Sequence, residues 1–177
     1  MPTQGPSSPT AASQSGSGTT WTNPTDIESN VSAATCSLVA TTGVSKIIAG
    51  TAFGFSIPSV ATINGIAISF VGWASGSGVD AAGSIKLLKA GIAVGTAKNG
   101  STWATTQGAG LQTLGGSSDL WGTTWTPSDI NNAGFGFELQ AENVAGLSRT
   151  ANLQAYLATV YYTAGGARCS VSAFFNF

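Results

Sequence analysis

The sequence predicts an all-β domain, and three observations carry this prediction. Glycine accounts for 24 of the 177 residues, about twice the average usage of roughly 7%, which is typical of a chain with many tight turns. Apolar and polar residues alternate over several short segments rich in β-branched side chains, the pattern of half-buried strands. Helix signals are confined to one short stretch near residues 127–132. We therefore expect a single domain of strands joined by turns.

The alternation places strands at successive positions along the chain. Pro58 should end a strand over 53–57, because proline cannot donate to a sheet ladder. Ile63 is out of phase with Ile66, so we expect a β-bulge at Gly65 to absorb the slip. The segment 152–163 is the strongest strand, and because both its faces are largely apolar it should be central or covered on both sides. The other strand-like segments are 36–40, 47–48, 66–71, 85–87 and 92–94, and a polar segment runs from Trp103 to about 111–114.

The stretch 115–137 contains a loop, a short helix and a strand in that order. Thr126 is a good N-cap, Pro127 suits the first helical position, and Asp129 completes a capping box. Gly134 should stop the helix near residue 132. Period-two spacing then puts one set of residues on the buried face of a strand: Phe135, Phe137, Leu139 and Ala141.

Charge is scarce along the whole chain. Six Lys or Arg residues and seven Asp or Glu residues give a net charge of −1, which offers no footprint for nucleic acid or anionic lipid. No apolar run approaches the roughly 18 residues that a membrane helix needs. The first residues lack the basic and apolar regions of a secretory signal, so we do not expect export by the general pathway. Neither a nucleic acid nor a membrane is expected as a partner.

Residues suited to bond chemistry are sparse. The chain has no histidine, which removes His-dependent nucleophilic catalysis and most zinc sites. Glu138 and Glu142 share a strand face but lie roughly 13 Å apart at strand spacing, farther than the roughly 5 to 9.5 Å of a glycosidase pair. Asp26 and Glu28 are closer, but in a loop. We expect no catalytic residue, no cofactor and no metal site, although the Asp80 loop or the Asp26–Glu28 pair is a weak candidate for calcium.

The two cysteines, Cys36 and Cys169, do not have the spacing of a metal site. Two readings stay open for them. They form a disulfide that closes most of the domain, or they are two buried free thiols, which the composition favours.

Tryptophan is the remaining candidate for ligand binding. Aromatic faces stack on the apolar faces of sugars, so the five tryptophans allow a carbohydrate site. The alternative is that they plug the ends of the core and anchor loops. Trp121 and Trp125 should be mostly buried, because they flank a helix too short to be stable by itself. The residues concerned are Trp73, Trp103, Trp121 and Trp125.

Several motifs together resemble a family of small jelly-roll-like β-sandwich domains found in tailed-phage virion proteins and in related bacterial surface proteins. The motifs are Trp-x-x-Pro (21–24), Phe-Gly-Phe-x-Ile-Pro (53–58), Ile-x-Gly-Ile (63–66), Gly-Gly-x-x-Asp-Leu-Trp-Gly-x-x-Trp-Thr (115–126), Phe-Gly-Phe (135–137) and Val-Tyr-Tyr-Thr (160–163). The resemblance covers roughly Trp21 to Thr163. It implies a jelly-roll-like antiparallel β-sandwich, and domains of this kind serve as decoration, spike, fibre and adhesion modules, so it does not select one function.

Composition divides the chain into an extended polar N-terminal arm over 1–20, a β-sandwich domain over 21–163 and a C-terminal β extension over 164–177. The arm lacks apolar side chains that would offset its ordering entropy. We expect it to be disordered in the isolated protein and to lie across a neighbouring subunit in an assembly. Its candidate assembly contacts are Pro2, Gln4, Pro6 and Pro9.

The last ten residues, Arg168 to Phe177, have an alternating apolar face. Val171, Ala173, Phe175 and Phe177 lie on one side of a strand of this segment. We expect the strand to pair with a sheet edge, in its own subunit or in a neighbour, with Val171, Phe175 and Phe177 as candidate assembly contacts.

These observations favour a non-enzymatic virion structural protein. Most concretely, we expect a bacteriophage head decoration or cement protein, assembled in the host cytoplasm and located at the capsid surface. It would bind the major capsid protein or another virion protein as a homo-oligomer, with a trimer favoured. The alternative is a carbohydrate-binding adhesion module of a tail fibre, spike or cell surface that recognises a surface polysaccharide. Exposed tryptophans in a cleft would favour this alternative, whereas buried tryptophans would favour the structural role.

Overall fold

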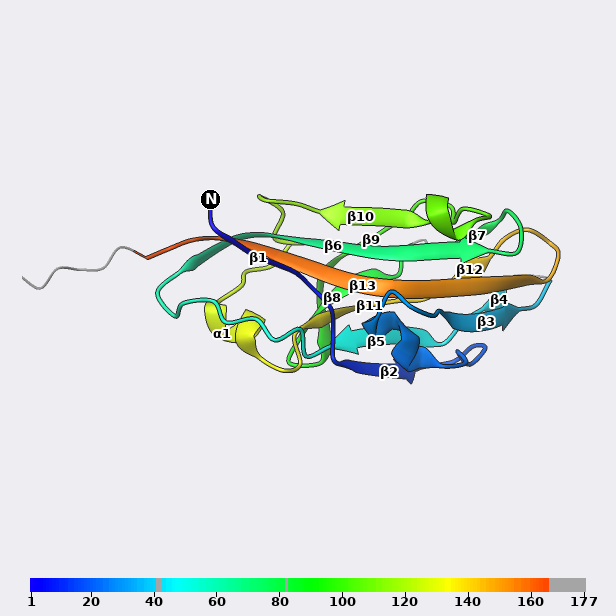
Figure 1. Ribbon diagram of the computed structural model, residues 1–177, viewed down its shortest axis with the longest axis horizontal. Coiled ribbons are helices and arrows are strands. Elements are labelled where there is room, and N and C mark those ends of the chain that lie inside the picture. The colour runs from blue at the N-terminus through cyan, green and yellow to red at the C-terminus, as the bar shows by residue number, and fades with distance from the viewer. Residues whose placement is uncertain (41–42, 82, 166–177) are drawn as a thin grey trace, which may run out of the picture.

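Two packed antiparallel sheets form the domain (Figure 1), as the sequence predicts for an all-β sandwich. The structure is a computed structural model that describes residues 1–40, 43–81 and 83–165. Its strands are β1 (Thr3–Ser7), β2 (Ala11–Ser15), β3 (Ala34–Leu38), β4 (Gly43–Val44), β5 (Ile47–Thr51), β6 (Thr62–Ala74), β7 (Val79–Asp80), β8 (Ile85–Lys89), β9 (Ile92–Lys98), β10 (Leu111–Gly115), β11 (Gly136–Leu139), β12 (Glu142–Asn143) and β13 (Arg149–Thr163). The helices are α1 (Pro127–Asn131) and two 3-10 turns, η1 (Pro24–Glu28) and η2 (Gln107–Ala109).

The two large sheets share no strand. Sheet A has the order β1-β13-β6-β10, and β3 also pairs with β13. Sheet B has the order β2-β5-β11-β8-β9, and a small third sheet has the order β4-β12-β7. The long strands β6 and β13 lie at the centre of sheet A (Figure 1), so the segment 152–163 is central as expected.

The core lies between the inner faces of sheets A and B. Tyr156 of β13 is fully buried and stacks on Phe137 of β11, with 4.2 Å between ring centroids, so this pair joins the two sheets. The expected bulge near Gly65 is present: Tyr161 pairs with Gly65 and Tyr162 with Ile63, which leaves Asn64 as the extra residue. The bulge lets both isoleucines of this motif face the core.

Helix α1 begins as the sequence predicts. Thr126 is the N-cap, Pro127 is in the first turn, and both hydrogen bonds of the capping box with Asp129 are present. The helix ends at Asn131, one residue before the expected limit. All four apolar residues expected on the face of the next strand are buried: Phe135, Phe137, Leu139 and Ala141.

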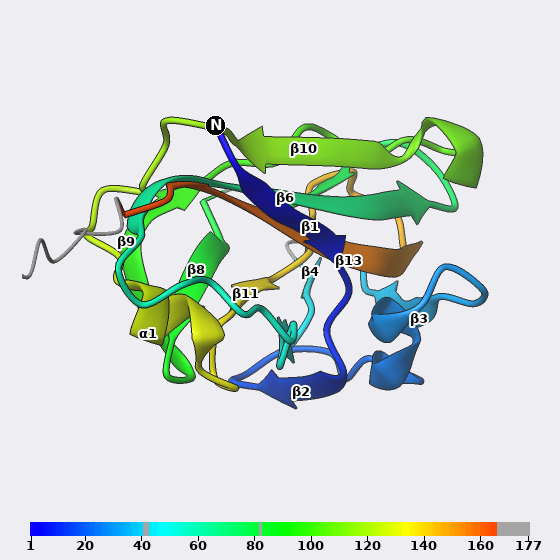
Figure 2. The ribbon, with the colours of Figure 1, turned by 60° about the vertical axis from the view of Figure 1, so that its left-hand side comes forward.

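The N-terminal arm is extended, but the expectation that it lies on a neighbouring subunit is wrong for this structure. Strand β1 pairs with β13 and strand β2 pairs with β5, so the arm contributes one strand to each sheet of its own domain (Figure 2). Pro2, Pro6 and Pro9 belong to this intramolecular segment, and Pro9 is buried. The lack of apolar side chains did not prevent this pairing, because backbone groups make the hydrogen bonds of a sheet.

The segment 53–57 is not a strand, contrary to the sequence expectation. Its residues alternate between buried and exposed as expected, but they join no sheet. Positive φ angles at Ala52 (58°) and Gly54 (71°) break the extended backbone. Side-chain amides take the place of a neighbouring strand: Gln4 exchanges two hydrogen bonds with the backbone of Ser56, at 3.0 and 2.8 Å.

Three further amides pair with loop backbone in the same two-bond manner. We call these four pairs the amide clamps. Each side chain donates its N–H to a backbone carbonyl and accepts the N–H of the same residue, as a strand neighbour would. The three are Asn131 with Ile57, Gln14 with Trp21, and Gln112 with Ser101.

The C-terminal extension lies outside the described residues beyond Gly165. Val171, Phe175, Phe177 and Cys169 are among these residues, so the expected strand over 168–177 stays a prediction. None of the helices in the described part of the chain is long and apolar enough to span a membrane.

Candidate functional site

The tryptophans considered as ligand candidates divide into two groups. Trp103, Trp121 and Trp125 are buried, with 2%, 1% and 7% of their surface exposed, so the expectation of burial for Trp121 and Trp125 is confirmed. Trp73 is half-buried on the outer face of β6. Of these four, only Trp73 can present an aromatic face to a ligand at the surface.

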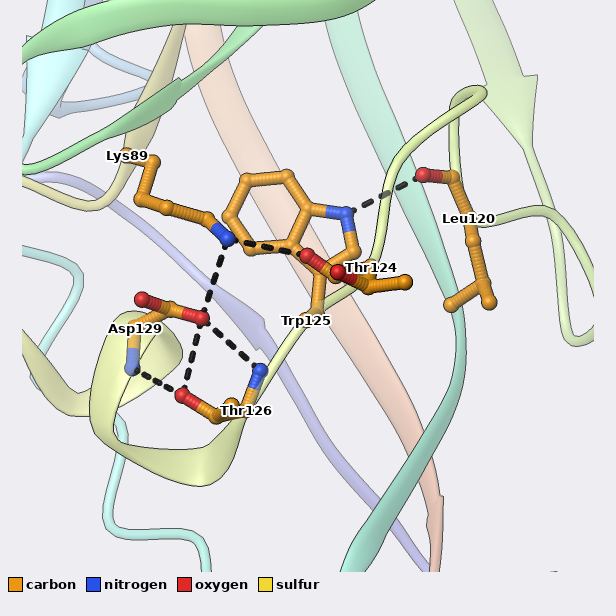
Figure 3. A network of polar contacts seen from close by, with 6 residues as sticks. All are labelled: Lys89, Leu120, Thr124, Trp125, Thr126 and Asp129. Atoms are coloured by element: carbon orange, nitrogen blue, oxygen red, sulfur yellow. Dashed lines mark hydrogen bonds and ion pairs between the residues drawn. The ribbon is translucent and has the colours of Figure 1, made fainter.

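Two lysines of sheet B hold the buried tryptophans of the 116–126 loop. The Lys89 ammonium lies 5.0 Å from the centroid of Trp125 and 3.1 Å from Asp129 Oδ2 (Figure 3). Lys98 repeats the arrangement on β9, 4.9 Å from the centroid of Trp121 and 2.8 Å from a carboxylate oxygen of Asp119. Each ammonium therefore has an aromatic face and a carboxylate as neighbours.

The Lys89 network also fixes the start of α1. Asp129 Oδ2 accepts the backbone N–H of Thr126 at 2.9 Å and its hydroxyl at 2.8 Å, and Lys89 donates to Thr124 O at 2.9 Å (Figure 3). Partial burial raises the pKa of Asp129, but the bonds from Thr126 and Lys89 outweigh it and hold the pKa below its usual value. The network anchors a loop; it contains no unpaired base or nucleophile.

The second network has the same character. The hydrogen bond from Lys98 lowers the pKa of Asp119 against the effect of burial, and the backbone N–H of Trp121 adds to the lowering. Sequence reasoning missed both lysines, because Lys98 and Asp119 lie far apart in the chain and no local spacing links them.

The other carboxylates do not converge. Glu138 lies on β11 opposite Lys86, and burial raises the pKa of its carboxyl against the attraction of Lys86. Glu142 lies in the small third sheet, and Asp26 and Glu28 lie on η1. Among the described residues, no three His, Cys, Asp or Glu side chains gather at one point.

Cys36 is a buried thiol on β3. Its Sγ lies 3.5 Å from Thr19 O, and burial raises its pKa to about 11, so the thiol stays protonated at neutral pH. Cys169 lies outside the described residues, so both readings of the two cysteines stay predictions.

Three exposed aliphatic side chains gather at one end of the sandwich, and we call them the apolar tip: Val39, Val144 and Leu147, each about three-fifths exposed. The fully buried Asn143 joins the loops that carry them. Its Nδ2 donates to Val39 O at 2.8 Å and to Leu147 O at 2.9 Å. A third loop is tied in because Val144 N donates to Gly78 O at 2.8 Å. These hydrogen bonds join the three loops that carry the apolar tip.

A shallow groove of about 340 Å³ crosses the outer face of sheet A. Val71 and the buried Gln154 come from the sheet, and Gln154 Nε2 donates to Asn30 Oδ1 at 2.6 Å. The remaining lining residues are Gln107, Gly108 and Leu111. The groove offers neutral amides and aliphatic surface, and Trp73 lies two positions from Val71 on the same face of β6.

The candidate assembly contacts of the arm also have definite places. Gln4 is committed to an amide clamp with Ser56, while Pro2 and Pro6 remain at the surface beside β13. Val171, Phe175 and Phe177 lie outside the described residues. The sequence missed the apolar tip, since its three residues come from separate loops and each looks like an ordinary exposed side chain.

No family model, no curated protein and no solved structure matches this chain. The resemblance to virion β-sandwich domains rests on the quoted motifs. In the structure, most of the bulky residues of these motifs lie in the core, among them Trp21, Phe53, Ile66 and Phe137. The motifs therefore describe how the sandwich packs rather than a site.

Proposed function

We propose that this protein is a non-enzymatic virion structural protein, most concretely a bacteriophage head decoration or cement protein. It binds the major capsid protein or another virion protein at the capsid surface as a homo-oligomer, with a trimer favoured. The sandwich acts as a rigid scaffold that presents loops to its partner. The resemblance described above motivates the proposal, and the surface of the domain supports it.

The observation that carries the proposal is the apolar tip. Exposed aliphatic side chains on a preorganised surface lose little entropy on docking, because their loops are already fixed. Asn143 fixes those loops from inside, through bonds to Val39 O and Leu147 O. Exposed aliphatic residues on loops that a buried asparagine joins are suited to attachment to a protein surface.

The distribution of charge agrees with this role. Lys89 and Lys98 are paired to carboxylates and to aromatic rings of their own chain, so they are not free to bind a distant anionic partner. The whole chain carries only six Lys or Arg and seven Asp or Glu residues, so contact with another subunit need desolvate few charges.

The test compares Leu147→Asp with Ile92→Asp in binding to heads assembled without this chain. Ile92 is 69% exposed at the turn between β8 and β9, so it controls for an added charge at an exposed aliphatic position. We expect Leu147→Asp to weaken binding about tenfold or more, because docking would bury an unpaired carboxylate. Ile92→Asp should bind as the unaltered protein does. Equal binding by both variants would contradict docking through the tip, and failure of the unaltered protein to bind heads would contradict the decoration role.

A second candidate function is recognition of a surface polysaccharide through the groove on sheet A. The specific observation in its favour is the half-buried Trp73 beside neutral amides, since sugars bind through stacking and amide hydrogen bonds. Binding to a panel of surface polysaccharides that Trp73→Ala abolishes would favour this function over capsid decoration.

A further inference from the structure

Strand β10 leaves one edge of sheet A open. It pairs with β6 on one side, and no strand of the described chain pairs with its other side (Figure 1). Its sequence, LQTLG, has no charged residue and no proline, and its pairing with β6 has no bulge. Charges, prolines and bulges are the usual protection of an edge, because free backbone groups can pair with another chain. β10 therefore has none of these means of preventing a further strand from pairing.

The other edge of sheet A differs. Strand β1 contains Pro6, which has no N–H to donate, and its pairing with β13 shifts in register between Gln4 and Ser7. A strand of this kind is a poor template for a further strand. Of these two edges of sheet A, β10 is thus the one suited to association.

The hydrogen bonds at the two ends of β10 set the phase of its ladder. Gly72 N donates to Gly110 O, and Gly116 N donates to Ile66 O. The backbone groups of the even-numbered residues of β10 therefore point toward β6, and those of the odd-numbered residues point away from it. No hydrogen bond within the described chain uses these outward groups. They belong to three residues that are all exposed: Leu111, Thr113 and Gly115.

A second copy of β10 matches this edge when it runs antiparallel about a two-fold axis at Thr113. Leu111 then lies opposite Gly115 of the second copy, and the two Thr113 residues lie opposite each other. In each of these pairs the outward N–H of one residue meets the outward C=O of the other. Every outward backbone group of both strands therefore gains a partner in a single register.

The side chains fit the same register. Leu111 is 64% exposed, and because a glycine lies opposite it, its side chain has room to lie on the neighbouring strand. Two threonines opposite each other are among the cross-strand pairs that stabilise sheets. Neither strand carries a charge, so the two strands pair without burying a charged side chain of their own.

We propose that two copies of this chain join through their β10 strands, which continue sheet A across a two-fold axis at Thr113. The inference deepens the proposed function, because it names a contact between copies, and it rests on that proposal for the homo-oligomer alone. A two-fold contact joins copies in pairs, so a trimer needs a different contact. None of the residues of the apolar tip lies on β10, so head binding is a separate readout.

Sedimentation of the full chain over a range of concentrations tests the proposal. The test variant is Thr113→Pro, which removes an outward N–H but suits an edge position whose N–H faces solvent. Its control is Thr113→Val, which keeps the N–H and the β-branched side chain. We expect a dimer for the unaltered chain and for the control, and dimerisation weaker by about tenfold or more for Thr113→Pro. Leu111→Lys is a second test variant, since a lysine on an edge strand opposes pairing.

Amide hydrogen exchange locates the contact. The outward amides of Leu111, Thr113 and Gly115 should exchange more slowly as the concentration of the unaltered chain rises. The amides of Gln112 and Leu114 point toward β6, so they are the internal control and should be equally protected at every concentration. If Thr113→Pro loses protection at these control amides, it has disturbed the fold, and Leu111→Lys then decides the test.

Three results would overturn the proposal. The first is a chain that stays monomeric at every concentration, and the second is an oligomer that a folded test variant leaves intact. The third is protection of the outward amides that dilution does not change, which would mean that the edge is covered within one molecule. A monomer that binds heads would refute this contact and leave the decoration role standing, whereas a dimer that does not bind heads would refute the decoration role alone.

Discussion

Two buried tryptophans differ in whether the indole N–H has a hydrogen-bond partner, and this difference makes a sharp prediction. Trp121 Nε1 donates to Ile66 O at 2.9 Å in the buried core. Trp103 Nε1 is buried and has no hydrogen-bond partner in the described part of the chain. Replacement of either residue by phenylalanine removes the same atoms, so the cost of lost ring volume is common to Trp121→Phe and Trp103→Phe.

The N–H groups determine most of the difference in stability, and a weaker contact of Lys98 with phenylalanine at position 121 adds to it in the same direction. Trp121→Phe loses a bond with a net value of about 1 kcal/mol, although Ile66 O keeps the backbone N–H of Gly116 at 3.1 Å. Trp103→Phe removes an unsatisfied buried donor, which recovers part of a desolvation penalty of about 1 to 3 kcal/mol. We therefore expect Trp121→Phe to be the more destabilising variant by about 2 kcal/mol or more.

Thermal and urea unfolding measure this difference directly. For a domain of this size, 2 kcal/mol corresponds to a gap in Tm of about 4 to 8 °C. Trp121→Ala sets the scale, with an expected cost of roughly 3 to 5 kcal/mol. If Trp103→Phe proves as destabilising as Trp121→Phe, or more so, the assignment of an unsatisfied N–H to Trp103 is wrong.

Three further predictions concern a carboxyl, the arm and the helix cap. Burial raises the folded-state pKa of Glu138, so ionisation of this carboxyl lowers the stability of the fold. The loss of stability is absent below the unfolded pKa of about 4.3 and complete above the folded pKa. Glu138→Gln should therefore raise the Tm at pH 7, with no difference below about pH 4. Deletion of residues 2–15 removes β1 and β2 and should lower the Tm by several degrees; an unchanged Tm in calorimetry would restore the expectation of an independent arm. Thr126→Ala should cost about 1 kcal/mol in urea unfolding, while Ser128→Ala, at an exposed position in the same helix, should cost much less.

Sequence patterns gave correct predictions for features that depend on residues close together in the chain. The capping box joins Thr126 to Asp129, only three positions along the chain, and it is present. The bulge beside Gly65 followed from two isoleucines out of phase, and it is present as well. The burial of Trp121 and Trp125 followed from the size of their rings and the short helix beside them.

The errors occurred where the partner is distant in sequence. Thr3 of β1 pairs with Tyr161 of β13, and the first twenty residues contain no pattern that predicts this pairing. The segment 53–57 has the alternation of a strand, but Gln4 and Asn131 meet its backbone instead of a strand. The apolar tip could not be predicted for the same reason, since only the fold brings Val39 and Leu147 together.

The amide clamps explain how a chain with so little charge fixes its loops. A side-chain amide offers one donor and one acceptor in the geometry of a peptide group, so it can replace a strand neighbour at a single residue. The bonds are neutral, which means that they neither titrate nor weaken through salt screening as exposed ion pairs do. Gln4 and Gln14 belong to the arm, so the polar residues that made the arm look unstructured are the ones that attach it to the domain. The low charge of the sequence and the intramolecular arm thus have one physical origin: glutamine and asparagine supply here the directed contacts that lysine and glutamate supply in more charged proteins.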